Sequence, residues 1–188
     1  MQARTEAILK NTGFTIVELM VAMVISLVVM GAIYSTFQVQ QQSYIHQERV
    51  AAVQQNLRAA MYYITREIRM AGYDPTGSSN FGVVTAASDS INFTMDYLYG
   101  DSALSDNGVI DSGEDITYSL SGTDLVRNAG SGNQVIAENI DSLELTYLDQ
   151  DSNGTNETVH IKIVGKSQKD TTISRTLESN AKCRNIDM

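Results

Sequence analysis

Lys10 to Phe37 read KNTGFTIVELMVAMVISLVVMGAIYSTF, and this stretch decides the fold. From Phe14 it continues for 24 residues with one side chain that is charged at neutral pH, Glu18. A helix of about 20 mostly apolar residues crosses the hydrocarbon core of a bilayer. The apolar region of a cleavable secretory signal is shorter, about 7–15 residues, and ends at a small-residue cleavage site. The stretch therefore predicts a membrane-spanning helix over residues 14–37.

The single carboxylate in this run needs a positive partner. An unpaired acidic residue in a membrane span costs on the order of 2–3 kcal/mol or more, and no basic side chain lies within the run. A cut between Gly13 and Phe14 would create an α-amino group four residues before Glu18, at the same end of the same helix. The amine of one subunit would then neutralise the carboxylate of its neighbour. Glu18 is therefore predicted to act in assembly.

An uncleaved signal anchor is the alternative interpretation. Arg4 and Lys10 would keep the short N-terminus in the cytoplasm, because positive flanks favour that side of the membrane. Glu18 would then be a simple interfacial residue.

The stretch GFTIVELMVAMVI, residues 13–25, resembles the type IV prepilin signature: a short polar leader ending in glycine, then phenylalanine, then glutamate at the fifth mature position. The resemblance implies that a membrane-embedded prepilin peptidase cuts after Gly13 and N-methylates Phe14. It also implies that residues 1–13 are a leader peptide and that Glu18 is the assembly glutamate. Many major pilins have a proline about two-thirds along the apolar run, whereas this chain has only Pro75.

The helix is predicted to continue beyond the membrane run, over residues 38–72. No strong helix breaker occurs between Phe14 and Ala71, and GlyTyrAspPro at residues 72–75 ends the helix, with Gly72 as C-cap. Spacings of 3 and 4 mark an apolar stripe that packs on a domain; its members are Val50, Val53, Leu57, Met61, Ile64 and Ile68. A short coiled coil is the competing interpretation of the stripe.

A β-rich domain is predicted over residues 73–188. From Phe81 onward the apolar period approaches 2, with Gly, Asn, Asp and Ser between the segments. In SLELTYL, residues 142–148, and TVHIKIV, residues 158–164, the alternate apolar residues share one face. We expect five to seven strands in an antiparallel sheet with one face against the helix stripe. The fold class is α+β and pilin-like.

The stretch LRAAMYYITREIRMAGYDP, residues 57–75, resembles PilW-type minor pilins and, more loosely, the J-type minor pseudopilin of type II secretion. The resemblance implies a minor pilin at the pilus tip that primes assembly. Its partners would be other pilins and minor pilins, the prepilin peptidase and an inner-membrane assembly platform. The chain would cross the inner membrane once, with its C-terminal domain in the periplasm, and later enter the pilus.

Charge is distributed unevenly along the chain. Residues 1–72 carry six Lys/Arg and four Asp/Glu, whereas residues 73–188 carry seven and eighteen. Nucleic-acid binding needs a basic patch, so an acidic C-terminal domain argues against that partner. Acidic loops instead suit solubility and, in places, hard cations.

Two acidic loops are candidates for calcium. In DQDSNGTNE, residues 149–157, oxygen-bearing side chains alternate around Gly154, as a hard cation requires; they are Asp149, Asp151, Asn153, Thr155 and Glu157. In SDNGVIDSGE, residues 105–114, Asn107, Asp111 and Glu114 fit the later positions of such a loop. Both loops also contain Asn-Gly, which tight hairpin turns favour, so solvated turns are the alternative.

No enzymatic signature is present: the sequence lacks a P-loop, a dinucleotide-binding glycine motif, a nucleophile elbow and a metalloprotease helix. Cys183, the single cysteine, is expected to be a core or edge residue rather than a nucleophile. Three functions remain open: a minor pilin, a minor pseudopilin of type II secretion, and a single-pass membrane sensor or binding protein that responds to calcium.

Overall fold

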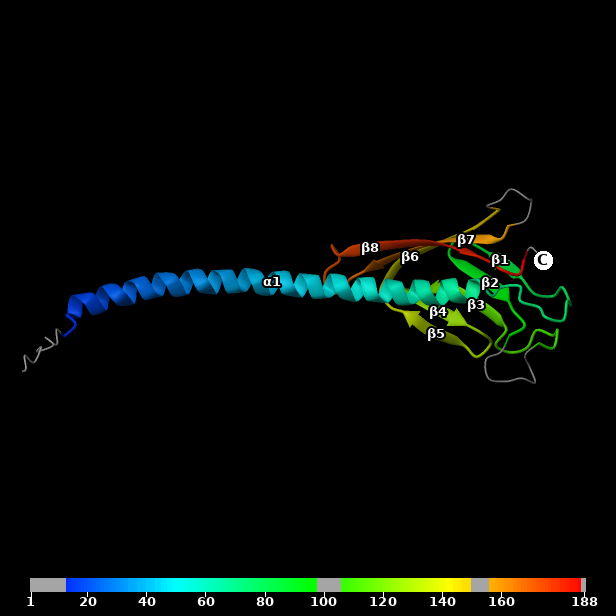
Figure 1. Ribbon diagram of the computed structural model, residues 1–188, viewed down its shortest axis with the longest axis horizontal. Helices are drawn as coiled ribbons and strands as arrows, with labels where there is room; N and C mark the ends of the chain where they lie inside the picture. Colours follow the sequence, from blue (N-terminus) through cyan, green and yellow to red (C-terminus); the bar gives the residue numbers. More distant parts are fainter. Residues whose placement is uncertain (1–12, 98–105, 150–155, 187–188) are drawn as a thin grey trace, which may run out of the picture. The chain divides into compact units, whose positions relative to one another are not determined.

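The structure is a computed structural model that describes residues 13–97, 106–149 and 156–186 (Figure 1). Within these ranges a single helix is followed by eight strands, which confirms the α+β, pilin-like class. The helix is α1 (Ile16–Ile68), and the strands are β1 (Val83–Ala86), β2 (Ser90–Thr94), β3 (Asp115–Ser121), β4 (Asp124–Asn128), β5 (Asn133–Ala137), β6 (Ile140–Leu148), β7 (Thr158–Lys166) and β8 (Ser174–Lys182). The chain divides into two units, Met1–His46 and Gln47–Met188.

The first unit contains the apolar half of α1. Every described residue from Gly13 to His46 is exposed, including apolar side chains all round the helix. A helix that is apolar on every side is suited to lipid or to a protein core. In the described part of the chain, α1 is the one helix that is long and apolar enough to cross a membrane.

In the second unit, α1 buries one stripe of side chains. The predicted stripe is confirmed, with Ala60 as an additional member, and Val50 is half-buried at its start. The buried members are Val53, Leu57, Ala60, Met61, Ile64 and Ile68. They form one hydrophobic core with the inward faces of the strands. Burying a large aliphatic side chain contributes about 1.5–3 kcal/mol, so this stripe is a main source of stability.

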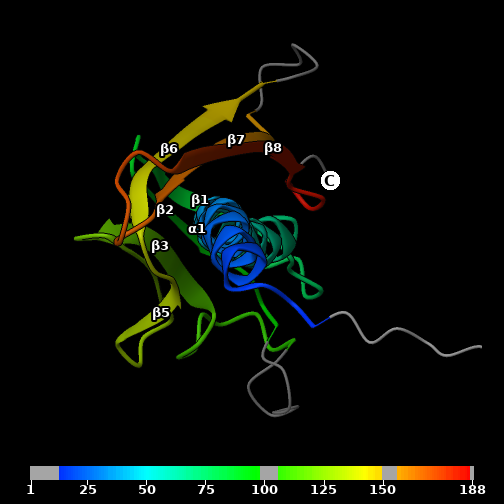
Figure 2. The same ribbon diagram turned by 90° about the vertical axis from the view of Figure 1, so that its left-hand side faces the viewer.

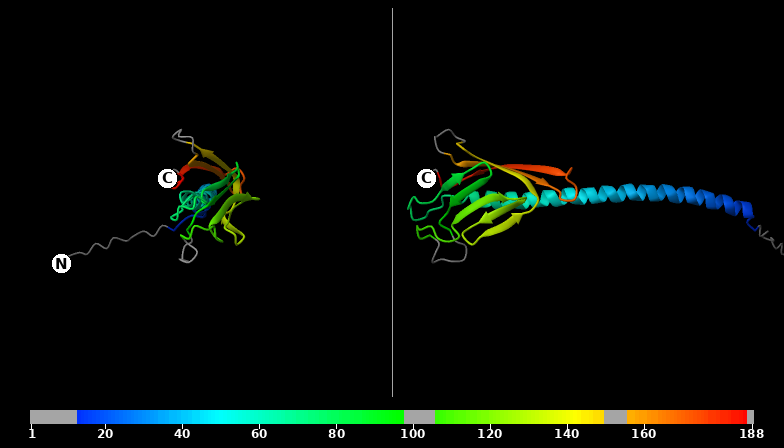
Figure 3. Two further views of the ribbon diagram at one scale, coloured as in Figure 1. Left: turned by 90° about the vertical axis from the view of Figure 1, so that its right-hand side faces the viewer. Right: turned by 180° about the vertical axis from the view of Figure 1, so that it is seen from behind.

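The strands form two antiparallel sheets rather than the single sheet expected from the sequence. One has the order β1-β2-β3-β4-β5 and the other has the order β6-β7-β8. Around the part of α1 in the second unit, both sheets lie to one side, and the other side of the helix is open (Figures 2 and 3). The expected strand count was too low because β1 and β5 are short edge strands with mostly exposed side chains, which leave little periodic signal.

The predicted faces of the two long C-terminal strands meet in register. Leu143 pairs with Ile163, and Leu145 pairs with Ile161. All four side chains are buried. Cys183 follows β8 and is also buried, as expected, with its amide donating to the Glu157 carbonyl at 2.7 Å.

A polar cluster fastens the end of α1 to the five-stranded sheet. Glu67 Oε2 accepts hydrogen bonds from Tyr118 Oη at 2.7 Å and from Arg127 Nε at 2.8 Å. Tyr118 is fully buried and stacks on Phe93. Burial, and then the charge of Glu67, raise the pKa of Tyr118 above its ordinary value. Tyr118 is therefore protonated at neutral pH and donates to Glu67.

Gly165 allows β7 to approach α1 closely. A Cβ at this position would lie 3.1 Å from Leu57 Cγ and 3.2 Å from Val53 Cγ1, both in the buried stripe.

We expect Gly165→Ala to lower the free energy of unfolding by about 1–3 kcal/mol, because the added methyl overpacks the core. Gly82→Ala is the control, since no atom lies within 4 Å of its Cβ position. Thermal unfolding of the full-length chain in detergent measures both; equal stability of the two variants would contradict the prediction.

Candidate functional site

The start of α1 is a capping box built from Thr15 and Glu18. Thr15 precedes the first helical residue, Ile16, and Glu18 lies in the first turn. The Glu18 amide donates to Thr15 Oγ1 at 3.3 Å, and the Thr15 amide donates to Glu18 Oε2 at 2.9 Å. Thr15 Oγ1 adds a second hydrogen bond to Glu18 Oε2, also at 2.9 Å. This reciprocal arrangement satisfies amides that have no partner inside the helix.

Glu18 has a second role at this position, because it completes the capping box. A carboxylate in the first turn also complements the positive end of the helix dipole. The signature T-x-x-E is present in the sequence as TIVE, residues 15–18, and it is the signal from which the capping contacts can be predicted. Its carboxylate is therefore hydrogen-bonded within its own chain before any neighbour is present.

Gly13 and Phe14 lie outside the helix and are accessible. Both precede Ile16 without regular secondary structure, and Phe14 is 87% exposed. No atom comes within 4 Å of a Cβ placed on Gly13. A peptidase needs an accessible, non-helical backbone at the bond that it cuts, and this segment provides one. The predicted cut therefore lies directly before the capped end of the helix.

The first predicted calcium loop is described only at its ends. Asp151, Asn153 and Thr155 lie outside the described residues. Asp149 is half-buried after β6, and Glu157 is fully buried before β7, with Oε1 3.8 Å from Lys182 Nζ. Calcium binding at this loop stays a prediction.

In the second loop, carboxylates accept hydrogen bonds from one side-chain amide and from three backbone amides. Asp111 Oδ2 accepts from Asn107 Nδ2 at 2.7 Å, and Glu114 Oε2 accepts from the Asp111 amide at 2.9 Å. Asp96, which sequence reasoning missed, is fully buried and accepts from the amides of Asn107 and Gly108 at 3.2 and 2.7 Å. Asp96 lies two residues after β2, and only the folded chain shows that it is close to Asn107 and Gly108.

The structure brings Asn107, Asp111 and Glu114 together in one loop, but these contacts already organise it without an ion. Across residues 13–97, 106–149 and 156–186, no group of three His, Cys, Asp or Glu side chains is arranged to hold a metal ion. Calcium binding by the second loop therefore also stays a prediction.

Two features define the class of this chain: a capped apolar helix with Glu18 in its first turn, and the accessible Gly13-Phe14 bond ahead of it. They describe a membrane-anchored subunit with a prepilin-type N-terminus. In agreement, residues 8–34 match the prokaryotic N-terminal methylation motif. Residues 46–183 match the family described as prepilin peptidase-dependent protein B.

The second match covers well over half of the chain, and the chain belongs to the prepilin peptidase-dependent protein B family. The two matches together make it a pilin or pseudopilin subunit, and pilin-like families are structural subunits rather than enzymes. No curated protein and no solved structure matches the chain.

Glu114 is expected to make the stability of the second loop depend on pH. Burial, partly opposed by the Asp111 amide, raises the pKa of Glu114 above its ordinary value of 4.5, and the nearby Asp96 and Asp111 raise it further. A group whose pKa is higher in the folded state than in the unfolded state stabilises the fold while it is protonated. This stabilisation is complete at pH values below the unfolded-state pKa, and it is lost as the pH rises through the folded-state pKa. Glu114→Gln keeps an acceptor for the Asp111 amide but removes the charge.

We expect the unfolding free energy of the parent chain to fall relative to that of Glu114→Gln as the pH rises above about 4.5. The difference levels off once Glu114 is fully ionised. Urea unfolding of the full-length chain at a series of pH values measures it. Glu138→Gln, at an exposed position, is the control. Parallel pH profiles for the parent and Glu114→Gln would show that the raised pKa is wrong.

Proposed function

We propose that this chain is a minor type IV pilin of the PilW type, a structural subunit that primes pilus assembly near the tip. The observation that carries the proposal is the Thr15–Glu18 cap directly after an accessible Gly13-Phe14 bond. The match of residues 8–34 to the methylation motif supports processing at this end of the chain. The resemblance of residues 57–75 to PilW-type minor pilins supports the finer assignment.

In this proposal, prepilin peptidase cuts between Gly13 and Phe14 and N-methylates Phe14. The processed subunit is held in the inner membrane by α1, with its C-terminal domain in the periplasm. It then joins other pilins at the assembly platform. There its Phe14 amine and the Glu18 carboxylate of a neighbour form an ion pair out of contact with water. Leaving one member of such a pair unpartnered costs about 3–5 kcal/mol, so the pair also selects correctly placed neighbours.

A minor pseudopilin of type II secretion is the second candidate. The methylation motif and the family match support it equally, because the anchor and the assembly chemistry are the same. Deletion in the native host separates the two: loss of surface pili supports the pilin, and loss of secretion supports the pseudopilin.

The N-terminal residue of the protein isolated from cells tests processing. We expect Phe14, N-methylated, as the first residue, because the cut removes the 13-residue leader. Replacing Gly13 by a bulky residue, for example Gly13→Leu, should leave the leader attached without preventing membrane insertion. Mass spectrometry of the intact chain identifies the first residue of the parent chain and of the Gly13→Leu variant. An unprocessed parent chain would contradict the proposal and favour the membrane sensor or signal-anchor interpretation.

Glu18→Gln separates the charge of Glu18 from its capping role. Glutamine can still accept from the Thr15 amide, whereas Glu18→Ala loses both the cap and the charge. We expect both variants to insert and to be processed. Because neither can neutralise a neighbouring amine, both should be at least tenfold depleted from sheared filaments, measured by quantitative immunoblotting. Normal incorporation of Glu18→Gln beside failure of Glu18→Ala would show that the cap, not the charge, matters.

A further inference from the structure

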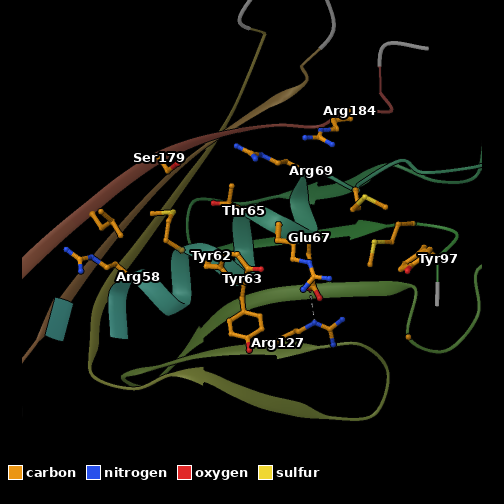
Figure 4. A pocket seen from close by; sticks show the side chains of 16 residues that line it. Arg58, Tyr62, Tyr63, Thr65, Glu67, Arg69, Tyr97, Arg127, Ser179 and Arg184 are labelled. Atoms are coloured by element: carbon orange, nitrogen blue, oxygen red, sulfur yellow. Dashed lines mark hydrogen bonds and ion pairs between the residues drawn. The ribbon is translucent and has the colours of Figure 1, made fainter. Parts of the chain in front are cut away.

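An open groove runs along the uncovered side of α1 within the second unit (Figure 4). Its volume is about 950 Å³. Side chains of α1 from Arg58 onward form the floor, together with Arg69 and Met70 directly after the helix. Leu177 and Ser179 of β8 line one side, and Arg127 of β4, Tyr97 and Gly113 line the other. Neither the capping box nor the calcium loops account for this groove.

The groove concentrates positive charge in an acidic unit. Residues 47–188 contain 11 Lys/Arg and 20 Asp/Glu, yet five arginines and one acidic residue line the groove. The acidic residue, Glu67, is already paired with Arg127. The four remaining arginines, Arg58, Arg66, Arg69 and Arg184, are all exposed, and none of them forms an ion pair among the described residues.

The side of the groove formed by β8 is a sheet edge. β8 pairs with β7 over its whole length and is the last strand of its sheet in the part of the chain that the structure describes. Leu177 and Ser179 pair with the buried Ile163 and Ile161 of β7 but are themselves only half-buried. An exposed strand edge offers unpaired amides and carbonyls to an added strand.

The floor of the groove offers aromatic contact area beside the arginines. Tyr62 and Tyr63 are 62% and 46% exposed, and their rings meet edge to face with centroids 5.9 Å apart. Exposed tyrosines and arginines together are typical of the residues that supply binding energy at protein interfaces. The eleven residues of α1 from Arg58 to Ile68 span about 17 Å at 1.5 Å per residue. About five residues of an extended strand cover the same length at about 3.4 Å per residue.

We infer that this groove binds an extended acidic segment of another polypeptide, which pairs with the free edge of β8 and directs alternate carboxylates toward Arg58, Arg66 and Arg69. Alternate side chains of a strand share one face, so a sequence with an acidic residue at every second position fits. Arginine binds carboxylates through two parallel hydrogen bonds, which adds orientation to attraction. That the other polypeptide is a neighbouring pilin-type subunit rests on the proposed function.

Photo-crosslinking in the native host tests the inference with the full-length chain. A benzophenone amino acid in place of Tyr62 is activated in cells, and the crosslinked peptide is sequenced by mass spectrometry. We expect a peptide from a different polypeptide with acidic residues at alternate positions. The double variant Arg58→Glu/Arg66→Glu should lower the yield of this crosslink at least fivefold. Arg175→Glu is the matched control, because Arg175 is an exposed arginine of β8 that does not line the groove.

Several outcomes would overturn the inference: a crosslink to lipid, to nucleic acid, to this chain or a second copy of it, or to a segment without alternating acidic residues, or no crosslink at all. An unchanged yield in the double variant would do the same. Thermal unfolding checks that each variant is folded; if the double variant is not, Arg58→Gln/Arg66→Gln replaces it. An intact N-terminus would overturn the proposed function alone, since the acidic crosslink does not depend on processing.

Discussion

The fold depends on one constraint: α1 has to remain helical without interruption while its surroundings change along its length. From Ile16 to His46 its apolar side chains are exposed on every side, and from Val53 to Ile68 one stripe is buried in a protein core. An unbroken backbone ladder satisfies the amides and carbonyls in both settings, which is essential in lipid because no water can replace a lost partner. Within the second unit, the two sheets pack on the stripe.

Three glutamates show how the position of a carboxylate decides what it does. Glu18 caps a helix in an apolar run and bonds Thr15. Glu67, the penultimate residue of α1, joins the helix to the five-stranded sheet through Tyr118 and Arg127. Glu114 is fully buried at a loop and bonds a backbone amide. Each accepts a hydrogen bond from a specific donor, and for the buried Glu114 this bond offsets part of the cost of removing a carboxyl group from water.

Much of the fold could be predicted because apolar periodicity is a local property. The stripe from Val53 to Ile68 and the paired faces of β6 and β7 follow from spacings of 3 to 4 and of 2. β1 and β5 could not be found this way, since short exposed edge strands do not need apolar alternation. The division into two sheets depends on which strands pair, and that is a long-range property.

The N-terminal part of the candidate site could be predicted for the same reason: Gly13, Phe14 and Glu18 are contiguous in the sequence. Asp96 and the Glu67–Tyr118–Arg127 cluster could not, because their partners are distant in the sequence and meet only in the folded unit. The groove could not be predicted from the sequence for the same reason. Its arginines lie between Arg58 and Arg184 in the sequence, and the net negative charge of this region gives no sign that they line one groove.

The close approach of Gly165 to Leu57 has a consequence for how the chain reaches its native state. These residues are 108 positions apart (165 minus 57), and the contact forms between the helix and one of the last strands. Contacts of such high sequence separation slow folding, since the entropy of closing the intervening loop is lost before the contact stabilises anything. During synthesis, the apolar stripe of α1 emerges from the ribosome long before β7, which covers it. Its side chains therefore stay exposed in the nascent chain until the strands of the second unit are complete.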